Sequence, residues 1–234
     1  MLSETLYSGT LLKVSDPVKG KTDAGRRREE HALRTRERIA GAALRLFLER
    51  GYVATTIEAI AAEAGVAPAT IYQAFGTKLR VLARVLDATI TGDTEPVALL
   101  DRDWVAAARR QSDARRRLEA VVRGAAQVAV QTAALKEVLR DAAATDPTVQ
   151  ELIRRDHERR RATQRELVKI SVGGDSLKPG MTLDRASDTF FVLVNSSNYG
   201  LATELLGWSD HEWQQWLIEL LTFQFFGGTS PGEW

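Results

Sequence analysis

The chain carries few of the side chains that perform catalytic or metal chemistry. Its 234 residues include no cysteine and only three histidines, His31, His157 and His211. His157 and His211 are each followed by glutamate, as in a zinc-binding helix, but Arg161 and Gln215 stand where the second histidine must be. Without cysteine, and with histidines this far apart, a metal site is not expected. The pattern therefore predicts neither an enzyme nor a bound cofactor.

A second group of polar side chains, near residue 70, is suited to a nucleic acid. The amide of Gln73 can pair with the edge of an adenine, and the methyl group of Thr70 can contact a thymine methyl. Tyr72 and Lys78 are suited to phosphate oxygens, which receive most of the contacts that position a protein on DNA. Thr55 or Thr56, at the start of a helix, would also present a hydroxyl and an amide to a phosphate. These residue types within one short segment predict a surface that contacts a DNA groove.

Two short helices are needed to hold these side chains in place. The first opens at Thr55 and Thr56, where a capping box begins with Thr55, and it ends at Gly65. The second begins near Pro68 and ends at Gly76. With a longer helix before them, they match a helix-turn-helix, in which the second helix lies in the major groove. On spacing alone, three helices of an unrelated bundle are an alternative. The residues expected to pack behind the second helix are Ile60, Ala61, Ala64, Val66, Ile71 and Phe75.

The rest of the chain also has a helical pattern, with no alternating strand run longer than four residues. We therefore expect an all-α fold, with an N-terminal three-helix helix-turn-helix domain and a larger C-terminal helical domain. The expected boundaries are a flexible basic extension at 1–28, the helix-turn-helix domain at 29–77, the C-terminal domain at 78–228 and a tail at 229–234.

The net charge of +1 conceals an uneven distribution. Residues 19–38 carry a net charge of +4, whereas residues 181–234 carry −6. A basic N-terminal end suggests contact with a polyanion, although a solvated basic tail fits equally well. The arginine clusters at 115–117 and 159–161 alternate with acidic residues and are interpreted as solvated helix faces. No run of 18 apolar residues and no signal peptide is recognised, so a cytoplasmic protein with no membrane partner is expected.

Two stretches resemble the DNA-binding domain of the TetR family. Residues 55–78, TTIEAIAAEAGVAPATIYQAFGTK, are similar to that family's DNA-binding signature, and residues 38–52 resemble its first helix. The resemblance implies phosphate contacts from Thr56, Tyr72 and Lys78, and groove contacts from Ala67, Pro68, Ala69, Thr70 and Gln73. The basic flank adds Arg34, Thr35 and Arg38 as candidates. Ala67 stands where the family usually has a capping serine, so the second helix is expected to lack a side-chain cap.

The resemblance also implies that the C-terminal helices bind a small molecule and pair two chains. Predicted helices at 184–206 and 210–226 would form the homodimer interface, unless their apolar stripe packs on its own chain. The interface candidates are Phe190, Val194, Leu201, Leu205, Trp213, Trp216, Leu217, Leu220 and Leu221.

A polar run inside the apolar pattern of 184–206 is the main candidate for a ligand pocket. Asn195 and Asn198, with Phe191 and Tyr199 beside them, would orient a guest, because buried polar groups must find partners. The same run could instead form a polar seam between two chains. Weaker candidates are Trp104, Gln127, Gln131 and His157.

The function implied by these features is a ligand-responsive transcriptional regulator. It would bind a palindromic operator on double-stranded DNA as a homodimer, act as a repressor, and be released by a small-molecule effector. The alternative is a helical ligand-binding dimer without DNA binding of its own.

Overall fold

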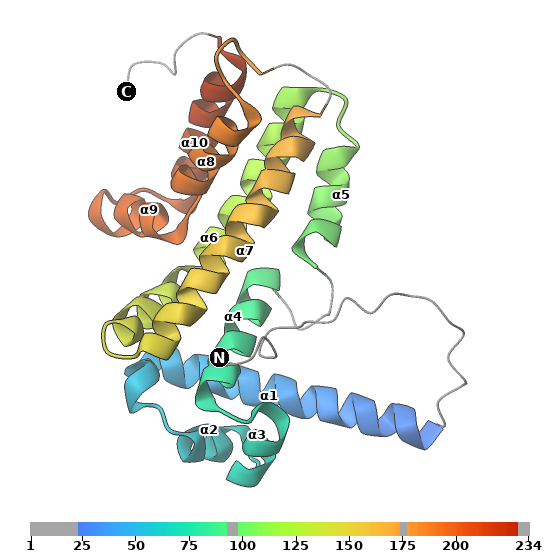
Figure 1. Ribbon diagram of the computed structural model, residues 1–234, viewed down its shortest axis with the longest axis vertical. Coiled ribbons are helices and arrows are strands. Elements are labelled where there is room, and N and C mark those ends of the chain that lie inside the picture. The colour runs from blue at the N-terminus through green and yellow to red at the C-terminus, as the bar shows by residue number, and fades with distance from the viewer. Residues whose placement is uncertain (1–22, 93–97, 174–176, 229–234) are drawn as a thin grey trace, which may run out of the picture. The chain divides into compact units, whose positions relative to one another are not determined.

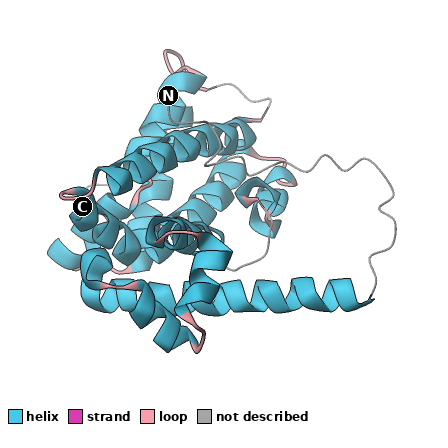
Figure 2. Cartoon of the chain, turned by 60° about the horizontal axis from the view of Figure 1, so that its bottom comes forward, coloured by secondary structure: helices cyan, strands magenta, loops and turns pink. Residues whose placement is uncertain are grey.

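The computed structural model describes residues 23–92, 98–173 and 177–228, and every regular element in these ranges is helical (Figures 1 and 2). The all-α prediction is therefore confirmed. Most of the expected basic extension (1–22) and the whole of the expected tail (229–234) lie outside the described residues. The elements are α1 (Asp23–Ala54), α2 (Ile57–Ala64), α3 (Pro68–Phe75), α4 (Lys78–Thr91), the short 3-10 helix η1 (Leu99–Asp101), α5 (Asp103–Arg109), α6 (Ala114–Ala143), α7 (Pro147–Val172), α8 (Leu183–Leu193), α9 (Ser196–Gly200), the π-helical turn η2 (Leu201–Leu205) and α10 (Asp210–Phe226).

Contacts divide the chain into two units, Met1–Arg36 and Glu37–Trp234. The described part of the first unit is helical, and Arg34 lies 3.9 Å from Glu30, one turn earlier on the same helix. Such an exposed pair contributes little to stability. The second unit contains the rest of α1 and all the remaining helices. No helix of the described residues has both the length and the apolar character needed to cross a membrane.

Glycines and a proline set the boundaries of α2 and α3. Thr56 begins α2, where its hydroxyl accepts a hydrogen bond from the Ala59 amide at 3.1 Å. Gly65 ends α2 in the left-handed conformation, with φ 63°, which glycine adopts without strain. Pro68 occupies the first turn of α3, and Gly76 (φ 79°) follows its last residue. The predicted helix-turn-helix is therefore present.

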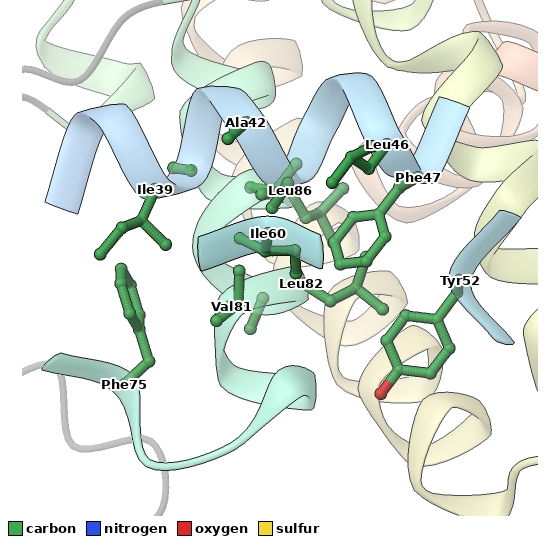
Figure 3. Close-up of a cluster of buried hydrophobic side chains, with 14 of the residues drawn as sticks. Ile39, Ala42, Leu46, Phe47, Tyr52, Ile60, Phe75, Val81, Leu82 and Leu86 are labelled. Atoms are coloured by element: carbon green, nitrogen blue, oxygen red, sulfur yellow. The ribbon is translucent and has the colours of Figure 1, made fainter. Parts of the chain in front are cut away.

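A first apolar core lies behind α2 and α3 (Figure 3). Ile39 and Phe47 of α1, Ile60 of α2, Phe75 of α3 and Leu82 of α4 are each at most 8% exposed. The core continues into the far ends of the two long helices, through Leu135, Leu139 and Ala142 of α6 and Val149 and Leu152 of α7. Helices α2 and α3 therefore rest on the same core as α6 and α7.

A second apolar core joins α5, α6, α7, α8 and α10. Its largest fully buried members are Phe190, Trp213 and Phe225, and α6 and α7 contribute Leu118 and Leu167. Helices α6 and α7 lie side by side and take part in both cores (Figure 1).

The predicted helix at 184–206 is not continuous, which corrects the sequence-based expectation. Helix α8 ends at Leu193, and Val194 leaves helical geometry with φ −87° and ψ 77°. The side chain of Asn195 then begins α9 by accepting hydrogen bonds from the Ser197 and Asn198 amides, both at 2.9 Å. An asparagine at this position offers the backbone an alternative to continuing the helix. The apolar spacing runs across the break, so spacing alone did not reveal it.

Candidate functional site

Helix α3 presents an open face opposite its buried side. Ile71 and Phe75 point into the first core, whereas Tyr72 and Gln73 are exposed and Thr70 is half-buried. The residues at its start, Ala67, Pro68 and Ala69, are also exposed. Ala67 makes no side-chain cap, as expected from its residue type, so the first amides of α3 have no hydroxyl or carboxylate from this position. The groove-reading candidates therefore share one accessible surface.

The two threonines before α2 have different environments, and one prediction is wrong. Thr56 is exposed and caps α2, so its hydroxyl and the nearby amides are accessible to a phosphate. Thr55 is fully buried, and its hydroxyl donates to the Gly51 carbonyl at 2.8 Å, with the Leu46 carbonyl at 3.2 Å. Because no surface of Thr55 is exposed, it stabilises the end of α1 and contacts no DNA. The capping residue is Thr56 instead of Thr55.

Lys78, predicted to contact a phosphate, has its ammonium hydrogen-bonded at the end of α1. Its ammonium donates to the carbonyl oxygens of Thr55 at 2.8 Å and Tyr52 at 2.9 Å, and lies 4.3 Å from the centre of the Tyr52 ring. Burial lowers the pKa of Lys78, against a weaker opposing effect of Asp146. The side chain therefore ties the start of α4 to the end of α1.

The basic flank contributes one residue with a defined structural role. A guanidinium nitrogen of Arg38 donates to the Ala64 carbonyl at 2.5 Å and to the Gly65 carbonyl at 3.1 Å, which caps the end of α2. A guanidinium has five donors, so this cap is compatible with a phosphate contact. Arg34 is exposed and Thr35 is half-buried, and both belong to the first unit.

A cavity of about 340 Å³ lies between α4, α6, α7 and the α8–α9 junction. Much of its wall is apolar and is formed by Ile90, Leu99, Ala125, Val128, Ala129, Leu167 and Val194. Its polar residues are concentrated on α7 and on the facing part of α6. Sequence reasoning missed them because Asp156 and Arg160 belong to the charged run interpreted as a solvated face, which Gln164 follows. Their spacing of four residues, which places them on one side of a helix, was the available signal.

An ion-pair network closes one side of this cavity. The carboxylate of Asp156, 5% exposed, contacts the Lys136 ammonium at 2.6 Å and the Arg159 guanidinium at 3.1 Å. Arg159 also contacts Asp87 of α4 at 2.7 Å. Burial raises the pKa of Asp156, but the charges and hydrogen bonds of Lys136 and Arg159 together outweigh it and hold the pKa below its usual value. The network therefore links α4, α6 and α7 around the cavity.

The predicted ligand residues lie elsewhere. None of the eight is on the wall of the 340 Å³ cavity. Four of them, His157, Phe191, Asn195 and Asn198, border a neighbouring hollow of about 450 Å³, which also touches Arg160. The polar run has partners within the chain, since the Asn198 amide donates to the Val192 carbonyl at 2.7 Å. Asn195 and Asn198 therefore join two helix ends, which explains their polarity without a guest.

The other four candidates have separate roles. Trp104 packs on α6 so closely that a Cβ at Gly124 would be 2.4 Å from its ring. Tyr199 packs on Trp213 and donates its hydroxyl to Asp210 at 2.7 Å. The remaining two, Gln127 and Gln131, are exposed, and Gln131 borders a third hollow beside α1 and α4.

Five of the nine predicted interface residues are buried in their own chain, which corrects that prediction. Phe190, Val194, Trp213, Leu217 and Leu221 are each at most 1% exposed and belong to the second core. Trp216 and Leu220 are half-buried. Leu201 and Leu205 are 58% and 74% exposed, and Val192 and Leu206, which were not predicted, are 61% and 62% exposed. An apolar stripe in sequence cannot distinguish a chain's own core from a partner, because both bury the same residue types.

Comparison with known families identifies the N-terminal part of the unit. The family model for bacterial regulatory proteins of the tetR family matches residues 39–85, which comprise most of the first core together with α2 and α3. Residues 39–85 therefore belong to the tetR family of bacterial regulatory proteins. No curated protein matches it in sequence.

Solved structures of similar fold include several transcriptional regulators. A transcriptional regulator from Saccharomonospora viridis in complex with choline has 21% identity and a TM-score of 0.60, with 81% of this chain and 96% of that chain covered. NalD, the secondary repressor of the MexAB-OprM multidrug efflux pump in Pseudomonas aeruginosa, has 20% identity and a TM-score of 0.62, covering 84% and 98%. FadR from Bacillus subtilis in complex with stearoyl-CoA has 17% identity and a TM-score of 0.62, covering 79% and 96%. At these identities the likeness concerns the fold.

Proposed function

We propose that this chain is a TetR-family regulator, which binds an operator on double-stranded DNA through α2 and α3 and is released from it by a small molecule. The observation that carries the proposal is the exposed face of α3, held on a buried apolar core within the residues that match the family model. The proposed DNA-binding domain is 29–77, and the proposed ligand-binding and dimerisation domain is 78–228.

The proposed DNA contacts include few side chains that contact base edges and several groups that contact phosphates. Gln73 and Thr70 are the polar side chains of α3 that would contact base edges in the groove. Thr56, Tyr72 and Arg38 would contact phosphates, together with the uncapped amides at the start of α3. We therefore expect an affinity that falls steeply with salt.

Repression and release by ligand are supported by two kinds of observation. NalD is described as a repressor, and two of the similar structures hold choline and stearoyl-CoA. In this chain, the cavity contacts Asp87, Ile90 and Thr91 at the end of α4, and α4 begins at Lys78, directly after the reading helix. Occupation of the cavity would bias the position of α4, which requires only that the ligand bind two arrangements with different affinity.

A homodimer is proposed because a palindromic operator requires two reading heads about one helical turn apart. The apolar side chains available for it are Val192, Leu201, Leu205 and Leu206, all more than half exposed. Replacing Leu201 and Leu205 together with glutamate should convert a dimer to a monomer in light scattering. A wild-type chain that is monomeric at micromolar concentration would contradict the proposal.

Electrophoretic mobility shift with DNA from upstream of the gene tests the function directly. The double variant Tyr72→Ala and Gln73→Ala should bind at least tenfold more weakly, since each lost contact is worth about 1–3 kcal/mol. Gln127→Ala, on the exposed surface of α6, is the control and should bind as the wild type does. An unchanged shift for the double variant would refute the assignment of α3. A selection from genomic fragments that enriches no sequence would favour the alternative, a ligand-binding dimer without DNA binding.

A further inference from the structure

Two residues that line the 340 Å³ cavity each have a buried side-chain atom with no hydrogen-bond partner among the described residues. These atoms are the side-chain carbonyl oxygen of Gln164 and the Nε of Arg160. A buried donor or acceptor without a partner costs about 1–3 kcal/mol, so native proteins retain few of them. Both atoms belong to α7, one turn apart, and both residues line the same cavity.

The orientation of the Gln164 amide is set by its neighbour. Gln164 is 6% exposed, and its amide nitrogen donates to the Val194 carbonyl at 3.3 Å. Rotating the amide by a half turn would place two carbonyl oxygens together, so the nitrogen must face Val194. The oxygen that remains can only accept a hydrogen bond. A guest at this position must therefore supply an O–H or N–H.

Arg160 offers the opposite kind of group. Its Nη2 donates to the Phe191 carbonyl at 3.0 Å, and its guanidinium lies 3.9 Å from the centre of the Phe191 ring. These contacts hold the guanidinium plane in place and leave Nε as a donor that requires an acceptor. Burial lowers the pKa of Arg160, against a weaker opposing effect of the Asp156 charge.

The charges around the cavity favour an anion. Asp87 and Asp156 are paired with Lys136 and Arg159, and these four charges cancel. Arg160 is left as the uncancelled charge on the lining, which makes the wall net positive. A carboxylate beside Arg160 would neutralise this charge and accept a charge-assisted hydrogen bond.

We propose that the cavity binds an amphipathic carboxylic acid that carries a hydrogen-bond donor next to the carboxylate, such as a 2-hydroxy acid or an N-acyl amino acid. The carboxylate accepts from Arg160 Nε, the neighbouring O–H or N–H donates to the Gln164 oxygen, and the carbon chain lies along the apolar wall. A volume of about 340 Å³ is that of roughly eleven waters at about 30 Å³ each, which matches the number of non-hydrogen atoms in an eight-carbon 2-hydroxy acid. This proposal names the effector class and rests on the proposed ligand response.

Isothermal titration of the full chain with four eight-carbon probes tests it. The probes are 2-hydroxyoctanoate, octanoate, 1-octanol and octylammonium. We expect 2-hydroxyoctanoate to bind most tightly and octanoate about tenfold more weakly, because octanoate leaves the Gln164 oxygen unpaired. Octanol and octylammonium should bind more weakly still. Octylammonium binding as tightly as the hydroxy acid, or no measurable heat from any probe at millimolar concentration, would overturn the proposal.

Two variants separate the contributions of the two atoms. Gln164→Leu should weaken 2-hydroxyoctanoate about tenfold and leave octanoate unchanged, since octanoate does not use the Gln164 oxygen. Arg160→Gln should weaken both acids at least tenfold. The controls are Gln127→Leu on α6 and Arg161→Gln on α7, whose side chains do not line the cavity, and both should bind as the wild type does. Equal losses of both acids in Gln164→Leu would refute the assigned donor contact.

Titration without DNA keeps this proposal distinct from the proposed function. If 2-hydroxyoctanoate binds but the chain shifts no DNA, the regulator assignment fails and the cavity assignment stands. If the chain shifts DNA but binds none of the probes, the cavity assignment fails alone. Arg160 also supports the α8 backbone, so circular dichroism must first show a native melting curve for Arg160→Gln. Gln164→Leu carries the test if that variant is unfolded.

Discussion

The contact between Lys78 and the end of α1 predicts that this lysine is needed for folding more than for DNA binding. Lys78→Met keeps the aliphatic stem but removes the ammonium, which donates to the Thr55 and Tyr52 carbonyls at 2.8 Å and 2.9 Å and lies 4.3 Å from the Tyr52 ring. A hydrogen bond from a charged donor contributes about 1.5–3 kcal/mol, and a cation–π contact contributes about 0.5–1 kcal/mol. Because the site is half-buried, water replaces part of this stabilisation. We therefore expect a loss of about 2 kcal/mol.

Urea unfolding followed by circular dichroism measures this loss, and thermal unfolding should show a fall in Tm of about 4–8 °C for a unit of this size. Arg80→Met, an exposed change on the first turn of the same helix, is the control and should remain within about 0.5 kcal/mol of the wild type. The salt dependence of DNA binding should be the same for Lys78→Met and the wild type. The reasoning is refuted if Lys78→Met is as stable as Arg80→Met while its salt slope falls by about 0.9, the amount for one phosphate contact.

Three further predictions concern packing and pH. Gly124→Ala should lose about 1–3 kcal/mol in urea unfolding and alter tryptophan emission, because the new methyl would lie 2.4 Å from the Trp104 ring. Gly41→Ala, whose methyl meets nothing nearer than 3.9 Å, should instead gain about 0.5–1 kcal/mol, and equal effects of the two changes would contradict the close contact. Burial, with a smaller effect of a nearby carboxylate, raises the pKa of Tyr52 to about 12. Its contribution to the stability of the fold is therefore complete below pH 10 and is lost as pH rises to 12. Between pH 9 and pH 12, the Tm of Tyr52→Phe should therefore fall less than the Tm of the wild type. The lowered pKa of Asp156 implies that its carboxylate contributes to the stability of the fold above about pH 4 and that this contribution is lost in more acidic solution. Asp156→Asn should lower the free energy of unfolding by about 3 kcal/mol at pH 7. It should also reduce the change of this free energy with pH in acidic solution, and an unchanged pH dependence there would contradict this role.

The sequence predicts the helix-turn-helix well because local chemistry specifies it. The start or end of each helix is determined by a residue at or next to it. These residues are the capping threonine, Gly65, Pro68 and Gly76. The identity of the capping threonine was less certain, since Thr55 and Thr56 have the same side chain. Only the packing of α1 determines which of the two is buried.

The 340 Å³ cavity could not be predicted in the same way, because its wall is formed by helices far apart in the sequence. Arg160 lies in a run of charged residues that resembles a solvated face, and only the positions of α6 and α8 enclose it. The polar run at Asn195–Asn198 was the segment predicted to line a ligand pocket. Its residues join two helix ends, and a polar side chain that closes a backbone break has the same sequence appearance as one that orients a guest.

Helices α6 and α7 have a consequence for how the second unit unfolds. Each of them contributes buried residues to both apolar cores, with Leu118 and Leu139 of α6 as examples from the two ends. Loss of either core would leave one half of both helices without its packing, and a helix half of this kind is marginal in water. Neither core can therefore melt while the other persists. Residues 37–228 should consequently show one calorimetric transition, with equal van't Hoff and calorimetric enthalpies, and amide exchange along both helices should share a single opening free energy.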